Sequence, residues 1–254
     1  MRILHVNKFL YRRGGAEAYM EDLADLQAAS GHQVAYFGMA DQRNTHLEHA
    51  RHFPSHIEME PAPPTLAGKI AGLGRMMYSS SAARGMEEML DEFRPDVVHL
   101  HNIYHQLSPS VLRPLGRRRV PAVMTLHDYK LACPSYQFLD HGNLCQACLG
   151  GHFQHAVTRR CKDGSLAASA AVAAELFVHT LTRAYAPVRV FICPSEFMAG
   201  RMRAAGVFPG RLRHVPHFID TRGMATKSRP GGDPLVAGRL SPEKGIDVAI
   251  RAVG

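Results

Sequence analysis

The sequence has no segment that predicts a membrane span or a secretory signal. No uncharged apolar stretch approaches the roughly 18 residues of a membrane-spanning helix. The most apolar region, 166–174, is rich in alanine and runs into Glu175 and His179, which favours a packed helix. The chain starts with a strand-like run at 3–6 and without the cleavage pattern of a signal peptide. We therefore expect a cytoplasmic protein.

Several catalytic signatures are also missing. The sequence contains no G-x-G-x-x-G fingerprint of a nicotinamide dehydrogenase and no G-x-x-x-x-G-K-[ST] phosphate loop. It also lacks the H-E-x-x-H helix of a metalloprotease. We therefore expect no redox cofactor and no chemistry of these three classes.

Lysine is scarce among the basic residues. Only six of the 30 Lys and Arg residues are lysines, and the basic residues outnumber 22 acidic ones, for a net charge of +8. Arginine favours bidentate contacts with phosphates and carboxylates. Apart from 117–119 the arginines are scattered, so a functional basic face and a compositional bias both stay open. A nucleic-acid binder would concentrate them more, and we expect no nucleic-acid partner.

Short apolar runs alternate with segments of helical spacing along most of the 254 residues. The apolar runs that predict strands are 3–6, 33–37, 97–100, 121–126, 188–192 and 213–215. Helices are expected between them, for example where Met86, Met89, Leu90 and Phe93 recur at one-turn spacing. Because no hairpin turn joins the strands, the pattern predicts a parallel sheet covered on both faces. The fold class is a doubly wound, Rossmann-like α/β domain over about residues 1–220.

Two segments interrupt this alternation and a third restarts it. The polar, proline-bearing stretch 41–64 predicts a long connection, and 133–161 predicts a cysteine-rich insertion. After a linker at 221–233, a strand-like and a helix-like segment follow at 234–254. One strand and one helix cannot enclose a core. We expect 234–254 to be the truncated start of a second domain; the alternative is that it packs back on the first.

The candidate site lies where the strands end, since ligands of open α/β sheets bind beyond the carboxyl ends of the strands. The segments that follow the predicted strands carry polar or glycine residues at Gly14 and Gly15, His101 and Asn102, His127 and Asp128, and Ser195 and Glu196. Gly14 and Gly15 would let backbone N–H groups at the start of a helix approach a phosphate or sugar hydroxyl, although a tight turn is the plainer interpretation.

Five motifs together resemble the N-terminal half of a GT-B glycosyltransferase of the family 4 type. They are R-G-G-A-E at 13–17, D-V-V-H-L-H at 96–101, T-L-H-D at 125–128, C-P-S at 193–195 and G-R-L-S-P-E-K-G at 238–245. The resemblance extends over essentially the whole chain. It implies retaining transfer of a sugar from a nucleotide-sugar donor to a glycan or lipid-linked acceptor, in a cleft between two domains.

The resemblance also assigns roles to single residues. It implies that His127 contacts the donor sugar and the reacting region, with a structural histidine as the alternative. His101, Asn102 and Asp128 become candidates for acceptor contacts. Arg239 and Lys244 match the basic pair that neutralises the donor diphosphate, alongside Gly14 and Gly15. The paired glutamates that bind the donor sugar and ribose in relatives would lie beyond Gly254, so we expect this chain alone to be inactive.

Four of the five cysteines have the spacing C-x11-C-x2-C-x12-C, at Cys133, Cys145, Cys148 and Cys161. In a reducing compartment this pattern favours a structural Zn²⁺ site that pins the insertion. Unligated thiols, a disulfide and an iron–sulfur site are the alternatives. The resemblance also supports this interpretation, because a similar cysteine pattern occurs in some family 4 relatives.

The leading hypothesis is therefore a glycosyltransferase of polysaccharide or glycolipid assembly, in peripheral contact with the inner membrane face; the membrane contact rests on the resemblance. A second hypothesis is a non-catalytic module that binds a glycan or a partner carrying the missing domain. A third, a zinc-dependent nucleic-acid binder, lacks interleaved aromatic residues and a recognised motif.

Overall fold

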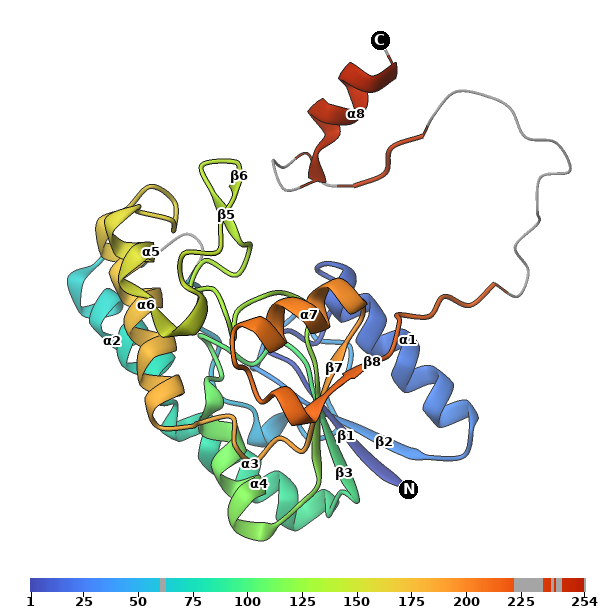
Figure 1. Ribbon diagram of the computed structural model, residues 1–254. Helices are drawn as coiled ribbons and strands as arrows, with labels where there is room; N and C mark the ends of the chain where they lie inside the picture. Colours follow the sequence, from blue (N-terminus) through green and yellow to red (C-terminus); the bar gives the residue numbers. More distant parts are fainter. Residues whose placement is uncertain (60–62, 222–234, 239, 241–243, 254) are drawn as a thin grey trace, which may run out of the picture.

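The computed structural model describes residues 1–59, 63–221, 235–238, 240 and 244–253, and a six-stranded sheet forms its centre (Figure 1). Every neighbouring pair of these strands is parallel. In spatial order the strands are β2 (Gln33–Phe37), β1 (Arg2–Val6), β3 (Val97–Leu100), β4 (Ala122–Thr125), β7 (Val190–Cys193) and β8 (Leu212–His214). The expected parallel sheet, with its six strand segments, is confirmed.

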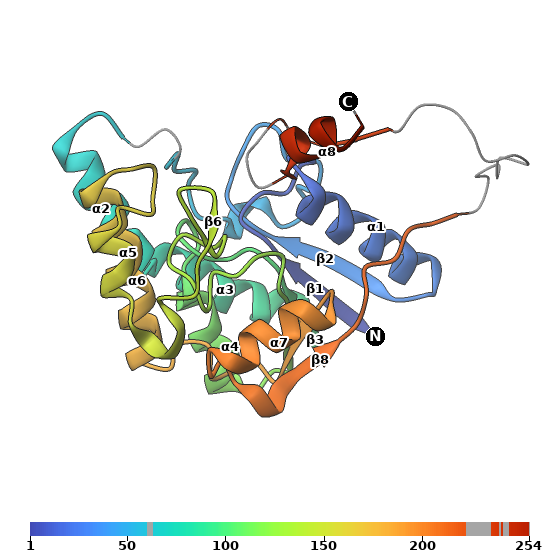
Figure 2. The ribbon, with the colours of Figure 1, turned by 45° about the horizontal axis from the view of Figure 1, so that its top comes forward.

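The order of the strands reverses at β1, which makes the domain doubly wound. The chain runs from β1 outward to β2, returns to the other side of β1 at β3, and continues to β4, β7 and β8. Helix α1 (Gly15–Ala29) lies on one face of the sheet, and α3 (Ser80–Phe93) and α4 (Leu112–Arg118) lie on the other (Figures 1 and 2). The carboxyl ends of β1 and β3 therefore form the switch point at which such sheets bind ligands.

The helices begin and end where the residue types favour it. In α3, Met86, Met89, Leu90 and Phe93 form the buried face, as their spacing predicted. The hydroxyl of Ser195 caps α7 by accepting a hydrogen bond from the N–H of Met198. The remaining helices are α2 (Leu66–Met77), α5 (Gln154–Thr158), α6 (Leu166–Leu181), α7 (Glu196–Ala204) and α8 (Ile246–Val253). None of the described helices is long and apolar enough to cross a membrane.

The structure adds elements that the sequence pattern did not indicate. Helix α2 follows the long connection, and the cysteine-rich segment contains α5 and a small antiparallel hairpin of β5 (Leu139–Asp140) and β6 (Asn143–Leu144). Helix α2 exposes most of its apolar residues, so its pattern is a weak signal for a core helix. The two-residue strands of the hairpin are too short to give a period.

Helix α6 buries polar as well as apolar side chains. Leu176 is buried, whereas Phe177 and Leu181 are 54% and 71% exposed. The polar residues Glu175 and His179 face inward. Glu175 is buried because it pairs with Lys130, 2.7 Å away, and with His105. Paired charge can be buried where unpaired charge cannot.

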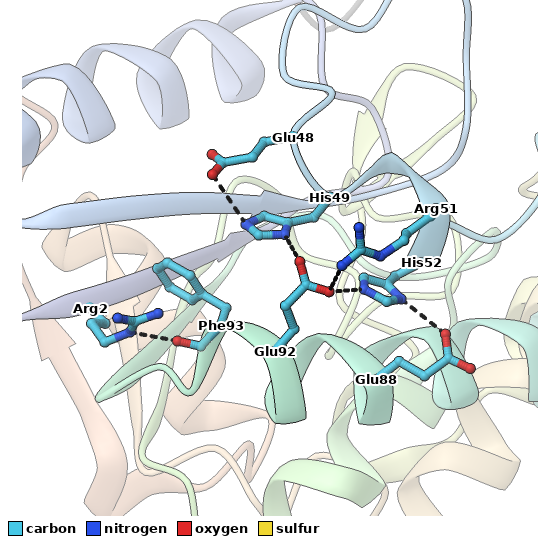
Figure 3. A network of polar contacts seen from close by, with 8 residues as sticks. All are labelled: Arg2, Glu48, His49, Arg51, His52, Glu88, Glu92 and Phe93. Carbon is cyan, nitrogen blue, oxygen red and sulfur yellow. Dashed lines mark hydrogen bonds and ion pairs between the residues drawn. The ribbon is translucent and has the colours of Figure 1, made fainter.

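A network of charged side chains attaches the short 3₁₀ helix η1 (Ala50–His52) to α3 (Figure 3). Glu92 accepts hydrogen bonds from His49 and His52, at 2.8 and 2.6 Å, and pairs with Arg51. The other ring nitrogen of His52 lies 3.0 Å from Glu88. Both nitrogens of His52 thus face carboxylates, an arrangement that favours the imidazolium form.

We expect Gly85→Ala to destabilise the domain because α3 packs directly against η1 at this glycine. A Cβ there would lie 1.9 Å from the backbone carbonyl oxygen of His52, which cannot move as a side-chain tip can. The forced shift should cost about 1–3 kcal/mol of unfolding free energy, measured by urea denaturation. Gly200→Ala is the matched control, since its Cβ meets open space in α7. Equal stability of the two variants would contradict this packing.

The network also predicts a pH dependence of stability. Hydrogen bonds from His52 lower the pKa of Glu92 to about 2. Burial lowers the pKa of His52, but Glu92 and Glu88 outweigh it and hold that pKa above its ordinary value. The contribution of Glu92 is therefore complete above its unfolded pKa of about 4.3 and is lost toward pH 2. That of His52 is complete below about 6.5 and is lost at higher pH.

Thermal melts of the wild type and of Glu92→Gln test this dependence. We expect the variant to lose stability at pH 5–6 and to converge on the wild type toward pH 2. Glu48→Gln is the control, because that carboxylate is exposed and 4.0 Å from His49. A constant difference between wild type and Glu92→Gln over the whole pH range would show that the network does not titrate in this way.

Candidate functional site at the switch point

Asn7 joins three elements where β1 ends. Its side-chain oxygen accepts a hydrogen bond from the backbone N–H of Asn102, at 2.9 Å, just after β3. Its amide N–H₂ donates to the carbonyl of Phe9 and, at 3.2 Å, to the carboxylate of Glu17 in α1. Because Asn7 is fully buried, these bonds hold the ends of both strands and the start of α1 in one arrangement.

Gly14 and Gly15 lie at the exposed N-terminus of α1. Gly14 is the N-cap in extended conformation, and neither glycine adopts a positive φ. An added Cβ would meet nothing within 4 Å at Gly15 and only Glu17, at 3.5 Å, at Gly14. The fold itself thus tolerates larger residues here. The glycines leave the first N–H groups of a helix open to an approaching anion.

His127 follows β4 and lies among rings from three segments. Nε2 of His127 is 3.0 Å from Nδ1 of His101. Its ring centroid is 5.7 Å from that of Tyr19 in α1 and 5.3 Å from that of His217, after β8. Tyr19 and His217 are themselves 4.0 Å apart. The sequence-predicted His127 is thus half-buried at the carboxyl edge, against aromatic rings on which an apolar sugar face can pack.

His101 lies directly behind His127 and is fully buried. Its Nδ1 bonds to His127, and its Nε2 lies 3.1 Å from Nδ1 of His5. Both ring nitrogens therefore have partners inside the domain, and a contact between His101 and an acceptor stays a prediction. Asn102 is half-buried and contributes its backbone to the switch point.

Burial keeps these imidazoles neutral. It lowers the pKa of His127 to about 3, with a further contribution from His217, and the pKa of His5 to about 4. The pKa values of His99 and His101 fall well below the ordinary value for the same reason. A neutral imidazole has one donor and one acceptor nitrogen. At neutral pH, the ring of His127 therefore offers hydrogen bonds and carries no positive charge.

Asp128, the next residue, forms its hydrogen bonds with Lys130 and Tyr104. Its carboxylate accepts hydrogen bonds from the backbone N–H of Lys130, at 2.9 Å, and from the hydroxyl of Tyr104. Burial raises the pKa of Asp128, and these bonds oppose the rise. The ammonium of Lys8 lies 4.1 Å from the centre of the Tyr104 ring. The carboxylate of Asp128 is thus bonded to Tyr104 and Lys130, while Asp128 and His127 line one small cavity together with Asn102.

The loop that carries His127 and Asp128 is anchored to α6. The ammonium of Lys130 is 2.7 Å from the carboxylate of Glu175, and His105 is 2.9 Å from the same oxygen. Burial alone would raise the pKa of Glu175, but Lys130 and His105 hold it below its ordinary value. An ionised, paired carboxylate in the interior costs several kcal/mol to break, so it ties the loop down firmly.

The chain matches a known family over most of its length. Residues 13–222 match the profile of glycosyltransferase family 4. The chain belongs to glycosyltransferase family 4. A comparison with curated proteins found no match.

Several solved structures are similar to this family 4 domain. Alr3699/HepE of Anabaena, in complex with UDP-glucose, is 15% identical, with a TM-score of 0.45; the match covers 90% of this chain and 47% of that one. UDP-GlcNAc 2-epimerase of Neisseria meningitidis, bound to UDP-GlcNAc, is 10% identical, with a TM-score of 0.38 and coverage of 84% and 45%. MurG of Acinetobacter baumannii is 13% identical, with a TM-score of 0.32 and coverage of 87% and 80%. The chain spans about half the length of the first two structures.

Sequence reasoning missed several residues that lie around His127 in the candidate site. Tyr19 and His217 pack on His127, and His5 and His99 lie behind it. For His5 and His99, the one signal in the sequence was a histidine inside an apolar strand segment, where an aliphatic residue is usual. Tyr19 and His217 have no such signal, because their approach to His127 depends on how α1 and the segment after β8 pack.

The basic pair predicted to hold the donor diphosphate lies in the part of the chain after the linker. Arg239 lies outside the described residues. Lys244 is exposed, and its side chain lies beside Gly238. The assignment of both residues stays a prediction.

Two groups of potential metal ligands occur in the domain. His5, His99 and His101 place one ring nitrogen each within 4.8 Å of the others, the one such group among the described residues. His5 and His101 already share a hydrogen bond, which a metal ion would have to replace. The four cysteines of the insertion are free thiols and do not form a group this tight.

The four cysteines nevertheless influence one another. Burial raises the pKa of Cys148 to about 12, and the thiols of Cys133, Cys161 and Cys145 add to the rise. Mutual repulsion of this kind disfavours thiolates unless a cation compensates it. The residue types fit Zn²⁺ ligation, while the spacing of the sulfur atoms is wider than a tetrahedral site requires. Zinc at these cysteines stays a prediction.

Metal analysis of the protein purified under reducing conditions tests the zinc prediction. We expect stoichiometric zinc in the wild type and its loss in Cys148→Ala, since a structural site rarely survives with three thiolates. Cys193→Ala is the control, because that thiol is buried in β7, away from the insertion. If zinc persisted in Cys148→Ala but disappeared in His99→Ala, the histidines would be its ligands and the prediction would be wrong.

Proposed function

We propose that this chain is the acceptor-side half of a retaining glycosyltransferase that uses a nucleotide-sugar donor. The acceptor is a glycan or a lipid-linked sugar, and the site is completed by a second domain that begins at about residue 234. The observation that carries the proposal is the position of a neutral, half-buried His127 at the carboxyl edge of a family 4 domain, bonded to His101 beside the switch point. The glycines that open α1 lie in the loop after β1, which is separated from the strand before His127 by β3.

In the proposed reaction, the oxygen of an acceptor hydroxyl bonds to the anomeric carbon of the donor sugar. The bond from that carbon to the diphosphate oxygen breaks, and the electron pair leaves with the nucleoside diphosphate. The acceptor hydroxyl loses its proton to the departing diphosphate. Charge grows on the diphosphate, so donors at the N-terminus of α1, together with Arg239 and Lys244, would stabilise the transition state.

His127 would act in this reaction by hydrogen bonding. Its neutral ring can hold a hydroxyl of the donor sugar, while Tyr19 and His217 pack against the sugar's apolar face. Asp128 would contact the acceptor only after exchanging its bond to Tyr104 for one to substrate. We therefore place His127 ahead of Asp128 in the proposed site.

Peripheral contact with the cytoplasmic face of a membrane is part of the proposal. Helices α2 and α6 pack against each other and expose apolar side chains to solvent. Those most exposed are Leu66, Ile70, Leu166, Phe177 and Leu181. Exposed apolar side chains on neighbouring helices, with a net charge of +8, suit an anionic lipid surface.

A transfer assay on the protein purified from its own source tests the function. UDP-glucose and UDP-N-acetylglucosamine would be offered with a membrane lipid extract, and the anomeric configuration of the product read by NMR. We expect transfer with retention, and at least about a tenfold loss of kcat in His127→Ala, since tenfold corresponds to about 1.4 kcal/mol of transition-state binding.

His152→Ala is the matched control, because that histidine is exposed in the insertion. Its activity should equal that of the wild type. Inverted product, or full activity in His127→Ala, would contradict the proposed mechanism. Binding of a glycan without turnover of any donor, by the protein from its own source, would instead support a non-catalytic module.

A further inference from the structure

Three imidazole rings form a continuous hydrogen-bonded chain from α1 to the candidate site. Gln27 of α1 places its side-chain oxygen 2.8 Å from Nε2 of His5. Nδ1 of His5 is 3.1 Å from Nε2 of His101, and Nδ1 of His101 is 3.0 Å from Nε2 of His127. Each ring therefore uses both of its nitrogens, except the last, whose Nδ1 has no hydrogen-bond partner within the part of the chain that the structure describes.

Because each ring carries a single N–H, the bond to Gln27 determines which nitrogen of each of the three imidazoles holds the proton. Each neutral imidazole carries a single N–H, so one nitrogen donates and the other accepts. The oxygen of Gln27 can only accept, which makes Nε2 of His5 a donor and its Nδ1 an acceptor. His101 must then donate from Nε2 and accept at Nδ1. His127 in turn must donate from Nε2, and its Nδ1 is left with a free lone pair.

We propose that Gln27 is a positioning residue that sets the tautomer of His127 through His5 and His101. The chain holds His127 as the Nε2–H form, with Nδ1 as a hydrogen-bond acceptor at the edge of the site. In the reaction proposed above, on which this last step rests, Nδ1 accepts a hydrogen bond from a sugar hydroxyl. The other tautomer would present a donor to that hydroxyl in its place.

The surroundings of the three rings favour this one arrangement of protons. His5 and His101 are fully buried, and a charged imidazolium in the chain would need a solvation that the interior does not offer. His99 stacks on His101 but bonds to the hydroxyl of Thr125, at 2.8 Å, so it does not branch the chain. Three rings from other elements lie against the row of imidazoles: Tyr36 is tilted against His5, Tyr19 meets His127 edge-on, and His217 is tilted against His127.

Tautomers can be read directly by two-bond ¹⁵N–¹H correlation spectra of the ¹⁵N-histidine-labelled full chain at neutral pH. In the wild type we expect the Nε2–H form of His127 in about tenfold excess, the ratio that one buried hydrogen bond supplies. Gln27→Glu keeps an acceptor at this position and should preserve the order. Gln27→Lys replaces the acceptor with a donor, and it should reverse all three rings and convert His127 to Nδ1–H.

Gln154→Lys is the matched control, because that glutamine is exposed on α5, and it should leave the spectrum of His127 unchanged. An Nδ1–H form in the wild type would overturn the proposal, even if no variant folds. So would a Gln27→Lys protein that melts as a folded domain and keeps His127 as Nε2–H. The spectra need no donor or acceptor, so a failed transfer assay and a wrong tautomer are separate results.

Discussion

The need of buried imidazoles to stay neutral and hydrogen-bonded is the constraint on which this site depends. A ring removed from water loses the solvation of its charge, and both of its nitrogens must find partners inside the protein. His5 and His101 meet this need by bonding to each other, to Gln27 and to His127. The ring of His127 is therefore held from behind, through two strands and α1, as well as by its own loop.

A second anchor acts on the other side of the same loop. The buried carboxylate of Glu175 pairs with Lys130 and His105, and the N–H of Lys130 in turn holds Asp128. The two anchors differ in kind, since one is a set of neutral hydrogen bonds and the other an ion pair. Together they hold the adjacent His127 and Asp128 in different surroundings, one beside aromatic rings and one beside a tyrosine hydroxyl. Because all six strands are parallel, the glycine loop after β1 lies at the same edge.

Much of the fold could be predicted from local patterns. The strands are nearly continuous apolar runs because helices cover both faces of the sheet, and Ser195 and the buried face of α3 marked helices by capping and spacing. The exposed apolar side chains of α2 and the burial of Glu175 on α6 could not be predicted in this way. Leu66 and Ile70 face solvent, and Glu175 is buried only because Lys130 from a distant loop neutralises it. Local periodicity carries no information on a partner that is 45 residues away, between 130 and 175.

For the site, the sequence by itself determined the family motifs, the parallel sheet and the position of His127 after a strand, because strand ends and glycine loops are local features of the chain. Tertiary structure alone decided that His101 lies buried behind His127, that Tyr19 and His217 pack on it, and that Gln27 reaches His5. These contacts join residues from separate strands and helices. Their distances follow from how the sheet and α1 pack, which no spacing along the chain records.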